Sequence, residues 1–303
     1  MNRRTFLASA SAFALSAPFC GCASLKTPKK TKLLFGVCKG PECVPLLKSV
    51  GYDFFEWGVG PALSPDKDNE WWNRQKDMIL SLPLPLIATN GFIPGHFRLT
   101  GPNANHDAAL DYAERAMRRA DEIGIKAIVF GSGGARNVPG DFCGSDRSKR
   151  PDIEKATDQF TAFCRKLAER VSDLKTTTVV IEPLRPYESN IINYVRIATQ
   201  IAREINSPRI KVLADIFHMM MGKDDPEAIV YANKDLLHCH IASYATRSFP
   251  GSDKNDAERF KPFFEALRTI GYDKAISCEC GWGEKENFAK NLETALKLMH
   301  SLA

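Results

Sequence analysis

The chain contains 303 residues, of which 44% are hydrophobic and 25% are charged, and its formal net charge at pH 7 is +5. This composition is typical of a soluble globular protein and supplies enough apolar residues for one large core. The modest charge does not favour a nucleic-acid-binding protein, because such proteins carry basic residues in clusters or stripes.

The first 21 residues predict an export signal of the twin-arginine type. Arg3 and Arg4 precede a run of apolar and small residues that is too short and too weakly apolar to span a membrane. The stretch FCGC resembles a lipoprotein cleavage box, and whether Cys22 is the lipidated first residue of the mature chain stays open. Residues 22–32 then form a basic, polar tether. We therefore expect a periplasmic protein, or a lipoprotein whose only contact with the membrane is the anchor at Cys22.

Residues 33–303 read as one domain in which short apolar runs alternate with longer amphipathic runs. The eight predicted strands are residues 33–38, 53–59, 85–90, 126–132, 177–183, 211–218, 236–243 and 274–281. The clearest helices, at 107–124, 156–174 and 286–302, repeat apolar residues at spacings of three and four. Eight strands alternating with helices predict a single closed parallel (β/α)8 TIM barrel of the α/β class. The alternative, an open doubly wound sheet, lacks a Gly-rich dinucleotide turn after its first strand.

Ionisable side chains follow four consecutive predicted strands. Glu182 ends the fifth strand, Asp215 and His218 the sixth, His240 the seventh and Glu279 the eighth. The C-terminal strand ends of a barrel form one face, and that face carries the active site. Carboxylates crowded there repel one another unless a cation neutralises them. Three carboxylates and an imidazole suit a hard or borderline divalent ion, although a purely structural acid network stays open as an alternative.

Strand ends that carry Glu, Asp-x-x-His, His and Glu in this order resemble the sugar phosphate isomerase/epimerase family of xylose-isomerase-like barrels, and in particular the ketose 3-epimerases. The resemblance implies that Glu182, Asp215, His240 and Glu279 bind one divalent metal ion. We expect Mn²⁺, with Mg²⁺, Co²⁺ or Zn²⁺ as alternatives.

The same resemblance implies a set of substrate contacts. His218 matches a histidine of the family that contacts substrate, and Glu188, six residues after Glu182, matches a second contact. Arg247 lies close to the substrate arginine of the family, although one residue further from His240 than the family pattern. Glu56 corresponds to a position that is usually acidic, beside the metal or on a substrate hydroxyl. A further candidate is Asn90, which ends the third predicted strand.

The expected reaction is isomerisation or epimerisation of a sugar. Removing a weakly acidic C–H proton beside a carbonyl produces an enediolate, which a divalent ion stabilises. Glu182 and Glu279 come from strands on different sides of the site, so we expect them to act as base and acid on opposite faces of a flat intermediate.

The substrate is expected to be an unphosphorylated sugar or keto-sugar, because an exported protein rarely meets sugar phosphates. Residues 130–140 contain a Gly-rich loop that resembles a phosphate cradle with Arg136 beside it. A tight turn explains the same loop equally well.

Three other functions are alternatives to an isomerase. A metal-dependent lyase or dehydratase acting on a keto-inositol or 3-keto-glycoside would use the same proton abstraction, and the sequence does not separate it from an epimerase. A nuclease of the endonuclease IV type needs further histidines, for which His96 is the one loose candidate. A non-catalytic sugar-binding lipoprotein has no need of a metal-ligand set. The identity of the sugar and the formation of a homo-oligomer stay open.

Nine cysteines in an exported chain raise the question of disulfides. Side chains alternate between the two faces of a strand, so Cys239, Cys278 and Cys280 are expected to point away from the site, toward the helices. Cys38 and Cys43 are the one local pair that we would test for a bridge.

Overall fold

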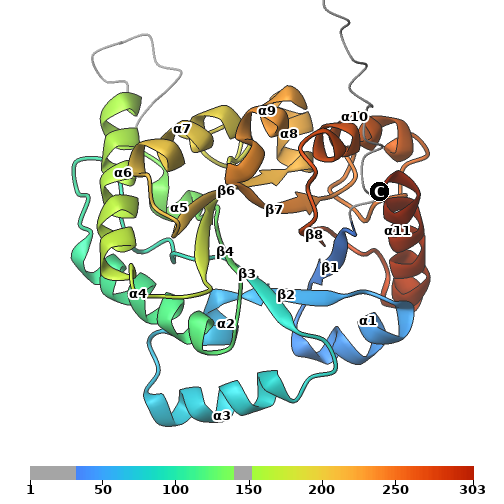
Figure 1. Cartoon of the computed structure of the whole chain (residues 1–303), viewed down its shortest axis with the longest axis horizontal. Coiled ribbons are helices and arrows are strands. Elements are labelled where there is room, and N and C mark those ends of the chain that lie inside the picture. The colour runs from blue at the N-terminus through green and yellow to red at the C-terminus, as the bar shows by residue number, and fades with distance from the viewer. Residues whose placement is uncertain (1–31, 140–151) are drawn as a thin grey trace, which may run out of the picture.

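The computed structural model describes residues 32–139 and 152–303, so the predicted export signal lies outside the described residues, as does the tether apart from Lys32. Eight parallel strands close into a barrel in sequence order, from β1 to β8, and helices surround it (Figure 1). The strands are β1 (Leu34–Cys38), β2 (Phe54–Gly58), β3 (Leu86–Asn90), β4 (Ala127–Phe130), β5 (Thr178–Ile181), β6 (Ile210–Asp215), β7 (Leu236–Ile241) and β8 (Ala275–Cys278). The predicted (β/α)8 barrel is therefore confirmed.

The helices follow the strands in the order expected of a TIM barrel. They are α1 (Val44–Val50), α2 (Val59–Leu63), α3 (Asn69–Leu80), α4 (Asp107–Glu122), α5 (Gly133–Arg136), α6 (Ile153–Arg170), α7 (Val195–Ile205), α8 (Ile216–Gly222), α9 (Glu227–Ala232), α10 (Asp256–Thr269) and α11 (Phe288–Leu302). Within residues 32–139 and 152–303, none of the helices has the length and apolar character that crossing a bilayer requires.

The strands are shorter than the sequence pattern predicts, and the difference matters at the sixth and eighth strands. The sixth strand ends at Asp215 because its carboxylate accepts hydrogen bonds from the backbone N–H groups of Phe217 and His218 and so caps α8. The eighth strand ends at Cys278, so Glu279 and Cys280 lie beyond it. The strict alternation of strand faces therefore does not extend to these residues.

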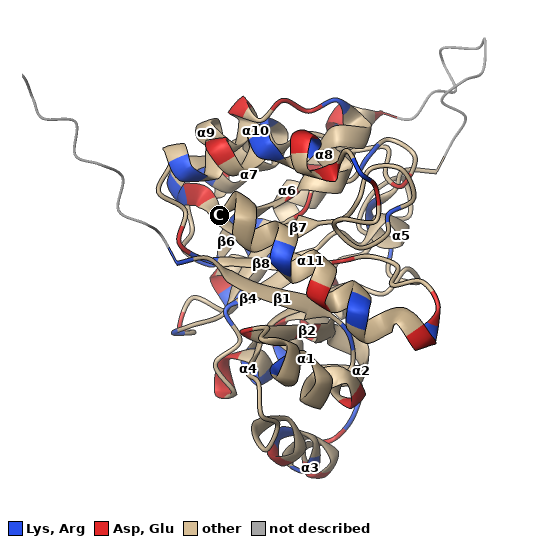
Figure 2. Ribbon diagram, turned by 90° about the vertical axis from the view of Figure 1, so that its right-hand side faces the viewer, with Lys and Arg blue, Asp and Glu red and all other residues tan. Residues whose placement is uncertain are grey.

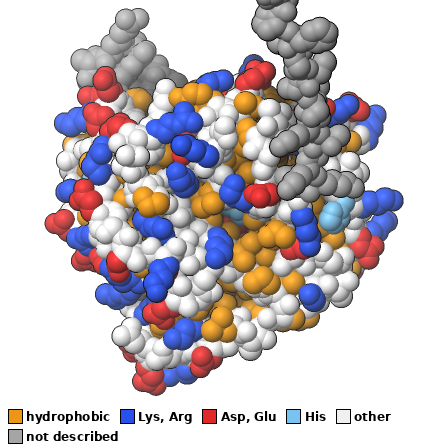
Figure 3. Space-filling model, in the orientation of Figure 1, with side chains coloured by type: hydrophobic (Ala, Val, Ile, Leu, Met, Phe, Trp, Pro, Cys, Tyr) orange, Lys and Arg blue, Asp and Glu red, His pale blue; other side chains and the backbone are white. Residues whose placement is uncertain are grey.

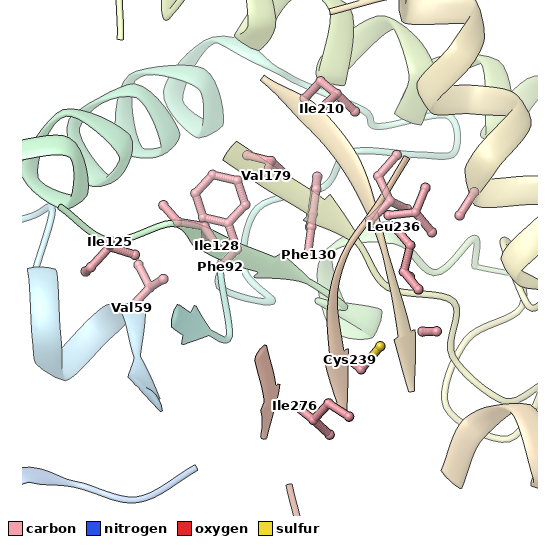
Figure 4. Packing of buried hydrophobic residues seen from close by; sticks show 14 of the residues in the cluster. Val59, Phe92, Ile125, Ile128, Phe130, Val179, Ile210, Leu236, Cys239 and Ile276 are labelled. Carbon is pink, nitrogen blue, oxygen red and sulfur yellow. The ribbon is translucent and has the colours of Figure 1, made fainter. Parts of the chain in front are cut away.

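The main hydrophobic core lies between the outer face of the barrel and the surrounding helices (Figure 4). Phe130 of β4 shows its packing: the ring centroid lies 5.3 Å from that of Phe92, 4.8 Å from Phe160 and 5.9 Å from Phe163. Replacing a buried Phe by Ala in such an environment costs about 3–5 kcal/mol. This packing fixes β4 against α6.

Charged residues concentrate on the outer helices and loops, whereas the strands are largely uncharged (Figure 2). Lys, Arg, Asp and Glu side chains are interspersed over the face seen in Figure 3. This face carries no continuous basic stripe of the kind that binds nucleic acid.

Candidate metal centre

The four predicted metal ligands meet at the C-terminal face of the barrel. Glu182 follows β5, Asp215 ends β6, His240 lies in β7 and Glu279 follows β8. Each offers one ligand atom, and these four atoms all lie within 4.8 Å of one another. His240 Nδ1 lies 3.4 Å from Glu182 Oε1 and 3.5 Å from Glu279 Oε2. The barrel thus brings together three carboxylates and one imidazole from four neighbouring strands.

Three of the four ligand atoms are buried without a hydrogen-bond partner among the described residues. They are Glu182 Oε1, Asp215 Oδ2 and His240 Nδ1. An unpaired buried polar atom costs about 1–3 kcal/mol, so native proteins rarely leave several of them side by side. A divalent cation would satisfy all three at once, and oxygen and imidazole donors are the ligands that Mn²⁺ and related ions take. The residues present therefore fit a divalent metal ion.

Asp215 combines two roles that the sequence presents as alternatives. Its Oδ1 atom accepts hydrogen bonds from the N–H groups of Phe217 at 2.7 Å and His218 at 3.2 Å, which caps α8. Its Oδ2 atom accepts no hydrogen bond from the described residues and lies 3.6 Å from His218 Nε2 and 3.8 Å from the guanidinium of Arg247. Capping holds the carboxylate in one orientation, so the free oxygen is positioned before any ion binds.

Glu56 of β2 lies below the cluster and is fully buried. Its carboxylate lies 2.9 Å from His238 Nε2, 3.1 and 3.2 Å from His240 Nε2 and 2.7 Å from Ser277 Oγ. Burial opposes ionisation of Glu56, but the two histidines hold its pKa well below the ordinary value. An ionised Glu56 accepts the Nε2–H of His240, which leaves Nδ1 as the ligand atom.

This position does not support the predicted contact of Glu56 with a substrate hydroxyl. Glu56 is 0% exposed and does not line the cavity above the cluster. Its place next to His240 fits the other alternative, a position beside the metal ligands. Ser277, which donates its hydroxyl to Glu56, was missed by sequence reasoning.

The environment drives the pKa values of Glu182 and Glu279 in opposite directions. Burial opposes ionisation of Glu279, but His240 and Arg247 bring its pKa to about 2. Burial raises the pKa of Glu182 above the ordinary value, although His240 acts against this rise.

A cavity of about 390 Å³ opens above the metal ligands. The predicted substrate contacts Asn90, Glu188, His218 and Arg247 all line it, together with Glu182 and Glu279. The barrel therefore collects these polar side chains around one space that is large enough for a monosaccharide.

The side chain of Arg247 contacts three other polar side chains that line the cavity. Its guanidinium lies 2.6 Å from Glu279 Oε2, 3.0 Å from Glu188 Oε1 and 3.4 Å from His218 Nε2. Its backbone adopts the left-handed region, with φ of 51°, which is uncommon for a residue with a side chain. The loop thus delivers the arginine to the site with its backbone in this uncommon conformation.

Two sequence interpretations need correction here. Arg136 is fully buried and donates to the backbone carbonyls of Phe130 at 3.1 Å and Glu182 at 2.9 Å. It holds strand ends together, so it is unavailable to a phosphate. Cys280 packs against the outer core as predicted but also lines the cavity, so the prediction that it points away from the site holds only in part.

The remaining cysteine predictions agree with the structure in part. Cys239 and Cys278 are fully buried among the outer core residues, as predicted. Cys38 and Cys43 are both free thiols, so the local pair is not bridged in this structure. Two groups of described residues could hold a metal, one formed by Glu182, Asp215, His240 and Glu279 and the other by Cys38, Glu56 and His240. His96 is exposed and belongs to neither group. The further histidine that a zinc nuclease needs is therefore not found in these groups.

Residues 44–302 match the sequence profile of the xylose isomerase-like TIM barrel family. The chain is 30% identical to the 3-dehydro-D-guloside 4-epimerase of Escherichia coli (strain K12) over 175 residues, which cover 56% of this chain and 62% of that protein. It is 27% identical to the probable ketose 3-epimerase of Synechocystis over 199 residues, or 64% of this chain and 62% of that protein. The chain thus spans less than two thirds of the length of these curated relatives.

The structure of D-psicose 3-epimerase from Clostridium cellulolyticum H10 with D-tagatose superimposes with a TM-score of 0.72. The superposition covers 90% of this chain and 99% of that one, at 16% sequence identity. At this identity the likeness supports the barrel fold alone.

Proposed function

The chain belongs to the xylose isomerase-like TIM barrel family, and within it we propose that the protein is a metal-dependent sugar epimerase or isomerase. One observation carries the proposal: three unpaired buried ligand atoms face one another beneath a polar cavity. The relatives named as a 3-dehydro-D-guloside 4-epimerase and a ketose 3-epimerase support the same class of reaction. The proposed substrate is an unphosphorylated sugar or keto-sugar.

In this proposal Glu182, Asp215, His240 and Glu279 hold the metal ion, with Mn²⁺ as the first candidate. The bound ion would supply positive charge beside the sugar oxygens and so favour loss of a proton from the neighbouring carbon. The side chains of the protein must orient the sugar, remove the proton and return it.

Glu182 and Glu279 are the proposed acid–base pair. They follow β5 and β8, so they reach the cavity from strands that are not neighbours. One carboxylate removes the proton beside the carbonyl, and the other delivers a proton to the opposite face, which inverts the carbon. His218, Glu188, Arg247 and Asn90 line the cavity around them and are the proposed contacts to the sugar hydroxyls.

The chemistry is tested by solvent exchange. The Mn²⁺-loaded protein is incubated in D₂O with a panel of free ketoses and keto-glycosides, and deuterium incorporation is followed by NMR. We expect deuterium at the carbon beside the carbonyl, together with the epimeric sugar. Loss of a substituent from the neighbouring carbon would instead identify a lyase. If no sugar in the panel exchanged, proton abstraction would be unsupported.

We also propose that the protein is exported by the twin-arginine route and is periplasmic or anchored through Cys22. The support is the sequence alone, since Arg3 and Arg4 precede an apolar run and a cleavage-box-like FCGC. That route carries folded proteins, so the metal could be loaded before export. Replacing both arginines by Lys should leave the protein in the cytoplasm, and unchanged export would refute the route. Mass spectrometry of the mature N-terminus decides whether Cys22 carries lipid.

A further inference from the structure

A second cavity opens at the opposite end of the barrel, where the strands begin. It has a volume of about 320 Å³, and its walls are mainly apolar, with Leu34, Ile87, Ala127, Leu237 and Ala275 among its lining residues. Bulky branched side chains normally fill the interior of a closed barrel in layers. Here two of the positions are alanines, so this end of the interior stays hollow. We call this space the floor cavity.

The inner face of the barrel above the floor cavity is apolar. Ala88, Ala127, Val129, Val180 and Leu213 form a cluster of their own, separate from the main core. Rigid neighbouring strands surround this cluster, so it does not collapse to fill the space beneath it. A persistent apolar cavity of this size falls within the range that binds small molecules.

The polar residues that line the floor cavity are Lys126, Thr176, Thr178, His238, Asp273 and Lys274. Lys126 and Lys274 directly precede β4 and β8. Lys126 is exposed and has no ion pair with another described residue, whereas Lys274 lies 3.9 Å from Asp273, an acidic residue that lines the same cavity. At the inner end, His238 is 1% exposed. Its Nε2 atom bonds Glu56 and Ser277, and its Nδ1 atom has no hydrogen-bond partner among the described residues.

We propose that the floor cavity binds a small monocarboxylic acid. The apolar body of the ligand would lie between Leu34, Ile87 and Leu237, and its carboxylate would lie at Lys126, the lining lysine that has no ion pair with another described residue. A dicarboxylate does not fit, since the inner end offers one imidazole and no cation for a second charge. The site is distinct from the sugar cavity, which lies at the other end of the strands.

Binding of hexanoate to the metal-loaded protein tests this proposal, with hexan-1-ol as a neutral probe of the same length. Isothermal titration calorimetry should give saturable binding of one hexanoate per chain. Hexan-1-ol should bind about two- to five-fold more weakly, the value of an ion pair that remains partly exposed. Ala127→Phe fills the cavity and should weaken both probes at least ten-fold. Circular dichroism checks that this variant folds, and Ala275→Leu replaces it if it does not.

A charge variant separates the floor cavity from nonspecific binding. Lys126→Gln should weaken hexanoate about two- to five-fold and leave hexan-1-ol unchanged. The control is Lys166→Gln, which removes the same charge from the exposed face of α6 and should change neither probe. The proposal is overturned if hexanoate fails to saturate, if it binds the cavity-filled variant as tightly as the wild type, or if Lys126→Gln has no effect on it.

Discussion

The Nε2 atom of His240 lies 3.1 and 3.2 Å from the two carboxylate oxygens of Glu56. This contact orients the ring so that Nδ1 points toward the carboxylates of the metal centre. The two residues are 184 positions apart in the sequence and both are fully buried. A carboxylate behind a ligating histidine fixes its tautomer and ring orientation and increases its basicity. Glu56 therefore orients a metal ligand although it does not line the cavity itself.

Glu56→Gln is expected to weaken metal binding by about 10- to 100-fold. A glutamine amide has one acceptor oxygen, so it cannot accept hydrogen bonds from His238, His240 and Ser277 as a carboxylate does. Metal affinity is measured by competition with a chromophoric chelator, and circular dichroism checks the fold. Glu42→Gln, at an exposed position, should bind metal as the wild type does. Equal affinity of the Glu56 variant and the wild type would remove the positioning role.

Glu279→Gln should reduce both metal content and epimerase activity. The change removes a charge that lies 3.5 Å from His240 Nδ1 and, in the proposed mechanism, a group that transfers a proton. Proton-transfer groups contribute about 10²–10⁴-fold, so we expect a loss of at least 100-fold in kcat. Glu284→Gln, at an exposed position five residues further on, is the matched control. Wild-type metal content and activity in the Glu279 variant would exclude Glu279 from the site.

Arg247→Gln is expected to increase metal affinity while reducing kcat/KM. The guanidinium lies 2.6 Å from Glu279 and 3.8 Å from Asp215, so it repels a cation bound between them. Removing it should favour the ion by about 1 kcal/mol, or about five-fold. Arg185→Gln is the control, because Arg185 also pairs with Glu188 but has no ion pair with Glu279 or Asp215 among the described residues. Weaker metal binding in the Arg247 variant would contradict this electrostatic account.

Gly131→Ala should disrupt the metal centre without unfolding the barrel. A Cβ atom at Gly131 would clash with Glu182 Oε2, so the carboxylate must move away from the cluster. We expect metal affinity to fall at least ten-fold and the urea midpoint to change little. Gly60→Ala provides the control, since a Cβ there meets nothing within 4 Å. A Gly131 variant that binds metal normally would show that Glu182 is free to adjust.

Asp121→Asn should destabilise the protein in a pH-dependent manner. Its carboxylate accepts hydrogen bonds from the backbone N–H groups of Lys175, Thr176 and Thr177 at 3.2, 2.7 and 2.9 Å. Burial opposes ionisation, but these bonds hold the pKa of Asp121 below its ordinary value. A lowered folded-state pKa means that the stabilisation is present above about pH 4 and is lost as the pH falls through the folded pKa.

Urea unfolding measures this difference. At pH 7 the Asp121 variant should lose about 1 kcal/mol of unfolding free energy, discounted for the partial exposure of the site. Once the pH falls below the folded-state pKa of Asp121, the variant and the wild type should converge. Asp158→Asn, on an exposed position of α6, should match the wild type at both pH values. A difference that stays constant with pH would show that the charge of Asp121 is irrelevant.

The alternation of strands and helices, and the polar side chains at the strand ends, could be predicted from the sequence. The pattern of apolar residues along the sequence predicts which segments form strands. In a closed parallel barrel the C-terminal ends of all strands lie on one face. Asp215, His240 and their partner carboxylates could therefore be placed together without coordinates. The order of residue types along the chain also pointed to the family.

The tertiary structure alone decided which side chains support the metal centre and where the two cavities lie. The β2–β3 pairing shifts register between Phe55 and Glu56, and closure of the barrel brings Glu56 under His240. β8 ends at Cys278 and Cys280 beyond it lines the cavity above the metal ligands, while Ala127 of β4 and Ala275 of β8 both line the floor cavity. A local pattern specifies the face that a side chain takes. The neighbours that it meets depend on contacts between distant parts of the chain, and these are set only when the barrel closes.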